Sequence, residues 1–294
     1  MTEYVATIGF FDGVHRGHGY LINQVVDVAR CCGLSSMLVT FDRHPQEVVG
    51  RGYVPKLLST LEERTAMLGK FDISRVEVLN FTEQLSLMSA KDFMKQILYD
   101  QLGVRVLIVG YDHRFGHGGG TAEDYVRWGK ECGVRVVEAR ELGEEKVSSS
   151  AIRRTLTEGK IEQANKMLGY AYELEGAVVD GFHIGRKIGF PTANLVVAKE
   201  KLIPCRGVYA VWAELEDGKV CKGMLNIGNR PTMHNGEQIS IECHLLGMSD
   251  NLYGQTLRLH LTHRLRDEQT FDSPELLREQ LQRDMEKVSI LPIP

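Results

Sequence analysis

Two histidines with a glycine between them lie where a predicted strand gives way to a predicted helix. His15 and His18 belong to the segment GFFDGVHRGHGYL, residues 9–21, which directly follows an apolar run. Imidazoles at a helix N-terminus, beside glycines that let a ligand approach the backbone, are suited to phosphate oxygens, because the helix dipole and free amides favour an anion. The alternative is that His15 and His18 only cap the turn or are hydrated, without binding a ligand. Core packing, however, gives no reason for one acid, two glycines and two imidazoles within eight residues.

A hydroxyl and an amide oxygen occur close together in GFPTANL, residues 189–195. Thr192 and Asn194 are two residues apart, so in an extended chain both side chains point to one face. Together they could hold Mg²⁺ with ATP phosphates, because magnesium takes few protein ligands and keeps several waters. The spacing leaves open the alternative that Thr192 and Asn194 belong to a proline turn and loop that bind no metal.

The segment SIECHLL, residues 240–246, alternates as a strand that is half buried. Ser240, Glu242 and His244 lie on one side, and apolar residues lie on the other. A carboxylate at Glu242 could accept the proton of a hydroxyl that attacks a phosphoryl group. The alternative is that Glu242 is a strand residue that faces solvent and has no catalytic role.

The elements that must position these groups differ between the two halves of the chain. In the first half, five apolar runs read as strands, at 4–9, 35–41, 75–81, 104–110 and 134–139, with helical patterns between them. This alternation predicts a parallel sheet covered on both faces, with ligands at the carboxyl ends of its strands. Three polar segments follow strands directly, so we expect them to meet at one edge: 9–21, 40–45 and 110–120.

After about residue 170 the pattern becomes strand-rich. EDGK at residues 216–219 is a hairpin signal, and a helix is expected from Ser273, a plausible N-cap, with Pro274 at the first helical position. This half is predicted to be an antiparallel barrel or sandwich with one terminal helix. The change of pattern places the domain boundary between 1–170 and 171–294.

Composition narrows the classes of protein. The chain has 294 residues, 43% hydrophobic and 25% charged, with a net charge of -4, which predicts two globular domains and no general affinity for nucleic acid. Six cysteines without C-x-x-C spacing suggest neither a zinc site nor a disulfide framework. No apolar stretch approaches the roughly 20 residues of a membrane span. We therefore expect a cytoplasmic protein with no membrane partner.

The histidine segment resembles the H-x-G-H signature of adenylyl and cytidylyl transferases. Further segments extend the resemblance over nearly the whole chain: TFDRHPQEV, VGYDHRFGHG, VSSSAIRRTL, GRKIGFPTANL, GVYAV, NIGNRPT, SIECHLL and LRDEQTFDSPELLREQLQRD. Their order and spacing are similar to those of bacterial bifunctional riboflavin kinase/FMN adenylyltransferases, also called FAD synthetases. The resemblance implies an α/β fold with an N-terminal Rossmann-like nucleotidyltransferase domain and a C-terminal riboflavin kinase-like barrel. It implies that riboflavin is phosphorylated to FMN and FMN adenylylated to FAD, with ATP and Mg²⁺.

In the first domain, the resemblance places His15 and His18 at the phosphates near the reacting centre. Arg153, with the hydroxyls of Ser148 and Ser149 at a helix start, could clamp the triphosphate, although an N-cap and a solvated arginine explain them equally well. The other expected contacts with ATP or flavin in this domain are Gly9, Phe10, Asp12, Gly17, Asp42, His44, Asp112 and Arg114. For Asp42 and His44, a purely structural role in the turn is the alternative.

In the second domain, the resemblance makes Glu242 the catalytic base and Thr192 and Asn194 the metal ligands. The glycine-rich, basic segment 181–189 could form a flap over phosphates. The other expected ATP or flavin contacts in this domain are Gly185, Arg186, Lys187, Gly189, Pro191, Asn226, Arg266 and Glu268. A helix-packing role is an alternative for Arg266 and Glu268.

Four positions depart from the family pattern: Arg43 in place of a proline, Ser150 in place of a threonine, Cys243 in place of a valine and Gly247 in place of an aspartate. Two other classes of protein stay in view. A class I aminoacyl-tRNA synthetase relative would share the H-x-G-H turn, but the chain has no K-M-S-K-S-like segment and no basic half. A flavin-binding sensor would keep the fold without the chemistry. The sequence is silent on oligomeric state.

Overall fold

The computed structural model describes residues 2–50, 52–110, 115–140, 143, 147–181, 185, 188–230, 238–248 and 251–293. Contacts within the chain divide it into two compact units, Met1–Ser149 and Ser150–Pro294. The division falls before the change of sequence pattern near residue 170, because the intervening helices pack on the barrel.

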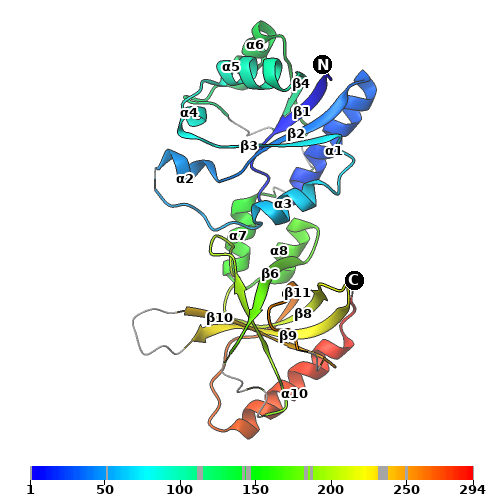
Figure 1. Ribbon diagram of the computed structural model, residues 1–294, viewed down its shortest axis with the longest axis vertical. Helices are drawn as coiled ribbons and strands as arrows, with labels where there is room; N and C mark the ends of the chain where they lie inside the picture. The colour runs from blue at the N-terminus through cyan, green and yellow to red at the C-terminus, as the bar shows by residue number, and fades with distance from the viewer. Residues whose placement is uncertain are drawn as a thin grey trace. The chain divides into compact units, whose positions relative to one another are not determined.

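The first unit is a parallel sheet of five strands in the order β3-β2-β1-β4-β5 (Figure 1). The strands are β1 (Tyr4–Ile8), β2 (Ser35–Phe41), β3 (Arg75–Leu79), β4 (Val104–Val109) and β5 (Arg135–Glu138). The helical segments of this unit are α1 (Arg16–Cys32), α2 (Pro45–Val49), α3 (Leu61–Leu68), α4 (Glu83–Ser86), α5 (Ala90–Asp92), the π-helix η1 (Phe93–Gln101) and α6 (Ala122–Cys132).

Helices cover both faces of this sheet, as the sequence predicts. Ala6 and Ile8 of β1 face a core that includes Met94 of η1 and Tyr125 of α6. Val5 faces the other way, toward α1. Alternate residues of a strand point to opposite faces, so a strand with both faces covered reads as one apolar run.

Helix α1 begins at the N-cap His15 and ends at Gly33, which has a φ of 67°. A left-handed C-cap of this kind favours glycine. Cys32 lies in the last turn of the helix and is exposed. The buried face instead consists of Ile22, Val25, Val26 and Ala29.

The second unit is a closed antiparallel barrel with the strand order β10-β7-β6-β11-β8-β9. Its elements are α7 (Ser149–Thr157), α8 (Ile161–Leu168), β6 (Tyr172–Val179), β7 (Ala193–Val197), β8 (Gly207–Leu215), β9 (Val220–Arg230), β10 (Gln238–Leu245), β11 (Thr256–Arg266) and α10 (Pro274–Ile290). The barrel and its terminal helix agree with the fold expected from the sequence, and the hairpin between β8 and β9 turns at residues 216–219.

Helices α7, α8 and α10 pack on the barrel (Figure 1). Asn165 of α8 donates from Nδ2 to Leu261 O at 2.8 Å, and the Cys205 amide donates to Leu156 O of α7 at 3.0 Å. The terminal helix α10 is capped by Ser273 and buries Val288 against Phe190 and its neighbours. These contacts explain why α7 and α8 belong to the compact barrel unit.

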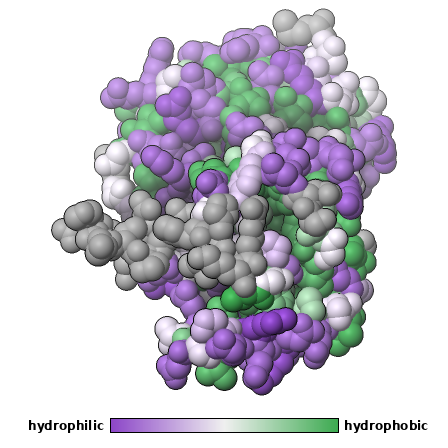
Figure 2. Space-filling view, turned by 60° about the horizontal axis from the view of Figure 1, so that its bottom comes forward, coloured by the Kyte–Doolittle hydropathy of each residue, from purple (hydrophilic) through white to green (hydrophobic). Residues whose placement is uncertain are grey.

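The surface is mixed in polarity. Figure 2 shows hydrophilic residues over most of the face in view, with apolar residues in smaller areas between them. Among the described residues, no helix has both the length and the apolar character needed to cross a membrane.

Candidate active sites

The two histidines form one stacked unit at the carboxyl end of β1. The His18 amide donates to His15 Nδ1 at 3.3 Å, and the two ring centroids lie 3.6 Å apart with planes 16° from parallel. The turn that carries them is unusual, because Phe11 and Val14 have φ values of 55° and 32°. Non-glycine residues rarely adopt such backbone conformations, which are concentrated at functional sites.

Burial fixes the protonation state of His15. The residue is 5% exposed, and desolvation lowers its pKa to about 4 despite the opposing charge of Asp12. Its ring is therefore neutral at pH 7. Because Nδ1 accepts the His18 amide, the ring proton resides on Nε2, where it can be donated to a phosphate oxygen.

Gly9 and Gly17 make room for rings of this turn. A Cβ at Gly17 would lie 3.2 Å from the His15 ring, and a Cβ at Gly9 would lie 3.1 Å from the ring of Phe11. The glycines therefore permit the packing that orients the histidines. Their expected contact with ATP stays a prediction.

Asp12 and Ser149 hold this turn in place. The Asp12 carboxylate is 3% exposed and accepts the amides of Leu58 and Ser59 at 2.9 and 3.0 Å. The Ser59 hydroxyl accepts the Gly13 amide at 2.9 Å, and the Ser149 hydroxyl donates to Asp12 O at 3.0 Å. No local pattern points to Ser59, because its partners Gly13 and Asp12 are distant in the chain.

A second group of expected site residues lies at the end of β2. Asp42 Oδ1 accepts the Phe81 amide at 2.8 Å, and Oδ2 pairs with Arg43 at 3.2 Å. Desolvation opposes ionisation of Asp42, but these partners outweigh it and hold its pKa below the ordinary value. His44 caps α2 and meets the ring of Phe10 edge-on at 4.9 Å. Phe10 therefore joins the ends of β1 and β2.

The other expected residues of this domain are less completely described. Asp112 and Arg114 lie outside the described residues. Ser148 is exposed immediately before α7, and Arg153 lies half-buried on α7, in the second compact unit.

In the barrel, strand register brings together an expected base, an expected metal ligand and an expected substrate contact. Glu242 of β10 lies opposite Asn194 of β7 on one side and opposite Asn226 of β9 on the other. Directly opposed residues of antiparallel strands have Cβ atoms about 4.5–5.5 Å apart. A carboxylate thus stands between two amide side chains in one row across three strands.

Gly181, which precedes β7, lies against Asn194 of this row. A Cβ at Gly181 would lie 2.1 Å from Asn194 Nδ2, and one at Gly185 would lie 2.1 Å from Phe190 O and 3.6 Å from Thr192 Cγ2. Asn194 is 6% exposed, so it has little room to move. Gly189 has a φ of 85°, whereas Arg186 and Lys187 lie outside the described residues.

His244 fixes the segment that carries Thr192. Its Nδ1 lies 2.7 Å from Pro191 O, and its ring meets Phe190 edge-on at 5.2 Å. Because His244 shares a strand face with Glu242, one strand both carries the expected base and holds the loop of the expected metal ligands.

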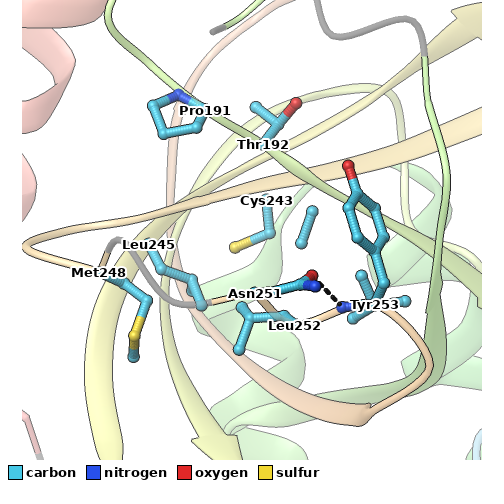
Figure 3. A pocket seen from close by; sticks show the side chains of 10 residues that line it. Pro191, Thr192, Cys243, Leu245, Met248, Asn251, Leu252 and Tyr253 are labelled. Atoms are coloured by element: carbon cyan, nitrogen blue, oxygen red, sulfur yellow. Dashed lines mark hydrogen bonds between the residues drawn. The ribbon is translucent and has the colours of Figure 1, made fainter.

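A cavity of about 430 Å³ opens beside Thr192. Figure 3 shows the Thr192 hydroxyl, the Tyr253 ring and the Cys243 thiol around it, with the Tyr253 amide donating to Asn251 Oδ1 at 3.2 Å. Leu245, Met248 and Leu252 supply apolar walls. An apolar cavity of this size with a few polar groups at its edge is typical of a small-molecule site.

Arg266 and Glu268 are two further residues that we expect from the sequence to contact ATP or flavin. Arg266 Nε pairs at 2.8 Å with Asp284 of α10, whose side chain is fully buried, so this arginine anchors the terminal helix. Glu268 lies against β9, because a Cβ at Gly228 would be 2.2 Å from its Oε1. Gly228 is two residues from Asn226, which places Glu268 beside the Glu242 row.

Comparison with known proteins assigns a family to each half of the chain. A FAD synthetase family model matches residues 1–151, and a riboflavin kinase family model matches residues 168–291. Bifunctional riboflavin kinase/FMN adenylyltransferases from Listeria monocytogenes and Bacillus subtilis are 36% and 35% identical to this chain, over 95% and 96% of it and 90% of each relative. The corresponding Escherichia coli protein is 34% identical, over 95% of this chain and 90% of its own length.

The chain belongs to the bifunctional riboflavin kinase/FMN adenylyltransferase family. It is therefore an enzyme with two transferase regions, as its resemblance to this family implies. The riboflavin kinase match in the second half decides against an aminoacyl-tRNA synthetase relative.

A solved structure supports the fold of both regions of this bifunctional riboflavin kinase/FMN adenylyltransferase family member. A crystal structure from Streptococcus pneumoniae, described as a macrolide-efflux protein, matches with a TM-score of 0.89 and 29% identity. The match covers 99% of this chain and 95% of that one.

Proposed function

We propose that residues 1–170 adenylylate FMN and residues 171–294 phosphorylate riboflavin, each domain using ATP at its own site. The observation that carries this assignment is the presence in each unit of a separate arrangement suited to phosphate chemistry. One is the His15/His18 stack, and the other is the row of Glu242 between Asn194 and Asn226.

In the adenylyl step, a phosphate oxygen of FMN attacks the α-phosphorus of ATP. A P–O bond forms there as the bond to the β-phosphate oxygen breaks, and pyrophosphate leaves. No protein nucleophile is needed, so the site must align the reactants and stabilise charge. Neutral His15 donates from Nε2 to a phosphate oxygen, and the stacked ring keeps His18 alongside.

The remaining residues of this site bind the substrates. Arg153, Ser148 and Ser149 hold the triphosphate through a charged fork and hydroxyls. Contacts with the nucleotide and flavin come from Gly9, Phe10, Asp12, Gly17, Asp42, His44, Asp112 and Arg114.

In the kinase step, the 5′-hydroxyl of riboflavin attacks the γ-phosphorus of ATP, and ADP leaves. Glu242 accepts the hydroxyl proton as the new P–O bond forms. The nucleoside of ATP occupies the cavity beside Thr192, and the flavin lies near Asn226, Arg266 and Glu268. The flap residues Gly185, Arg186, Lys187 and Gly189, with Pro191, enclose the phosphates.

The donor set in the barrel fits Mg²⁺. Thr192 and Asn194 offer hydroxyl and amide oxygens, and Glu242 lies directly opposite Asn194. Among the described residues, no group of three or more histidines, cysteines or carboxylates is placed to hold a metal. A site completed by phosphate oxygens and water suits magnesium. When bound, Mg²⁺ neutralises charge on the ATP phosphates.

A time course with riboflavin, ATP and MgCl₂, followed by chromatography of the flavins, tests this proposal. We expect FMN to appear first and FAD to follow, and EDTA to stop FMN formation until excess Mg²⁺ is restored. Full FMN formation in EDTA would contradict the metal site. Unchanged riboflavin with intact ATP would support the flavin-binding sensor instead.

A further inference from the structure

Arg64 is a buried cation beside the candidate adenylyl site, and no local motif distinguishes it from other arginines of the chain. It lies on α3 with no exposed surface. Nη2 donates to Phe41 O at 2.6 Å, whereas Nε and Nη1 have no hydrogen-bond partner among the described residues. The guanidinium carbon lies 4.0 Å from the centroid of the Phe10 ring.

Such a placement is costly for the folded state. A buried guanidinium with two unpartnered nitrogens loses its hydration without full replacement by hydrogen bonds. Burial lowers the pKa of Arg64, and the charges of Asp12, Glu62 and Asp42 only partly oppose this effect. Folding alone gives no reason to retain this arginine, because an apolar side chain of similar length would fill the space without that cost.

The two contacts of Arg64 lie at the ends of adjacent strands. Phe41 is the last residue of β2, and Phe10 follows β1 by two residues. The Thr40 hydroxyl donates to Phe10 O at 3.3 Å, which joins the same two strand ends. Because Phe10 immediately precedes the turn that carries His15, a shift at Phe10 would move the imidazoles.

We propose that Arg64 is a positioning residue for the adenylyl step, an inference that rests on the proposed N-terminal site. It clamps the ends of β1 and β2 through Phe41 O and the Phe10 ring, and so holds the histidine turn in its working geometry. Its charge, acting in a region of low dielectric, also favours the polyphosphate of ATP at this edge. Arg64 acts through these neighbours rather than by touching substrate.

The decisive variant is Arg64→Met in the full-length protein. We expect kcat for FAD formation from added FMN to fall about 10- to 100-fold, as for other displacements of about 1 Å. The thermal unfolding midpoint should stay unchanged or rise, and riboflavin phosphorylation should be unaffected. Arg64→Lys keeps the charge but not the planar fork, so it should recover part of the lost kcat.

Arg105→Met is the matched control. Arg105 also lies over an aromatic ring, 4.1 Å from the centroid of Tyr99, but it is near the opposite end of the sheet and pairs with Glu3. This variant should change the unfolding midpoint without changing either activity.

Three results would overturn the inference about Arg64. The first is an Arg64→Met enzyme within twofold of wild-type kcat. The second is a loss of activity matched by a loss of stability, with no recovery in Arg64→Lys. The third applies if Arg64→Met does not fold: a folded Arg64→Lys enzyme with wild-type adenylyl kcat would then overturn the inference. A reduced kcat of Arg64→Lys at an unchanged unfolding midpoint would support it. Failure of the proposed function itself would show differently, as a wild-type protein without adenylyl activity.

Discussion

The two units prepare for phosphate chemistry in different ways. In the parallel sheet, the candidate residues lie beyond the strands: His15 follows β1, and Asp42 and His44 follow β2. In the barrel, Glu242 and Asn194 are strand residues that meet through antiparallel register. One site is therefore an edge formed by loops, and the other is a row across paired strands.

This difference determines what each site is sensitive to. At the loop edge, caps and burial set the state of the candidate side chains, as His15 shows by capping α1 while desolvation lowers its pKa and keeps its ring neutral. In the row, backbone spacing controls it, because Gly181 leaves almost no free space beside Asn194. The first site should respond to charge and proton changes, and the second to small steric changes.

The largest expected effect is the separation of the two activities. Glu242→Gln removes the proton acceptor at nearly constant size, so FMN formation should fall about 10²- to 10⁴-fold while FAD formation from added FMN is unchanged. His15→Asn should do the reverse, with a loss of about 10²- to 10³-fold in the adenylyl step. Both rates can be measured on each purified variant by chromatography.

Glu175→Gln is the control for the carboxylate change. Glu175 lies on β6 and pairs with Arg258 at 2.7 Å, away from the row, so neither activity should change. Equal loss of both steps in either test variant would remove the distinction between the two sites.

A smaller effect is expected from Gly181→Ala. The added methyl group would lie 2.1 Å from Asn194 Nδ2, so the buried amide must shift from its position opposite Glu242. We expect a 10- to 100-fold loss of kinase kcat, in line with displacements of about 1 Å, and a higher Mg²⁺ concentration for half-maximal rate. A magnesium titration measures both. Wild-type kinase kinetics in Gly181→Ala would show that Asn194 needs no fixed position. The adenylyl activity of the same variant should remain unchanged and serves as an internal control.

The smallest effect concerns pH. The folded pKa of His15 is about 4, below its ordinary value of 6.5, so the unfolded chain binds this proton more readily. The contribution of His15 to the free energy of unfolding is therefore full above pH 6.5. It is lost as the pH falls from 6.5 to 4, by about 3 kcal/mol in total. NMR of histidine-labelled protein, assigned with His15→Asn, should show no His15 titration between pH 5 and 8. A midpoint near 6.5 would contradict its burial as a neutral donor.

Much of the fold follows from local sequence. The alternation of apolar runs with helical patterns predicts the parallel sheet, and caps such as Gly33 and Ser273 mark helix ends, because periodicity and capping depend on neighbouring residues. The segments that carry His15, Thr192 and Glu242 are also visible in the sequence as unusual groupings of phosphate- and metal-binding residue types.

Tertiary structure decided how those residues meet. The pairing of Glu242 with Asn194, the ion pair of Arg266 with Asp284 and the burial of Arg64 under Phe10 each join distant parts of the chain. Spacing in a sequence fixes which face of one element a side chain occupies, but register, desolvation and long-range partners arise only when elements pack. Local sequence thus specifies the elements and the kinds of chemistry, whereas packing specifies protonation, alignment and support.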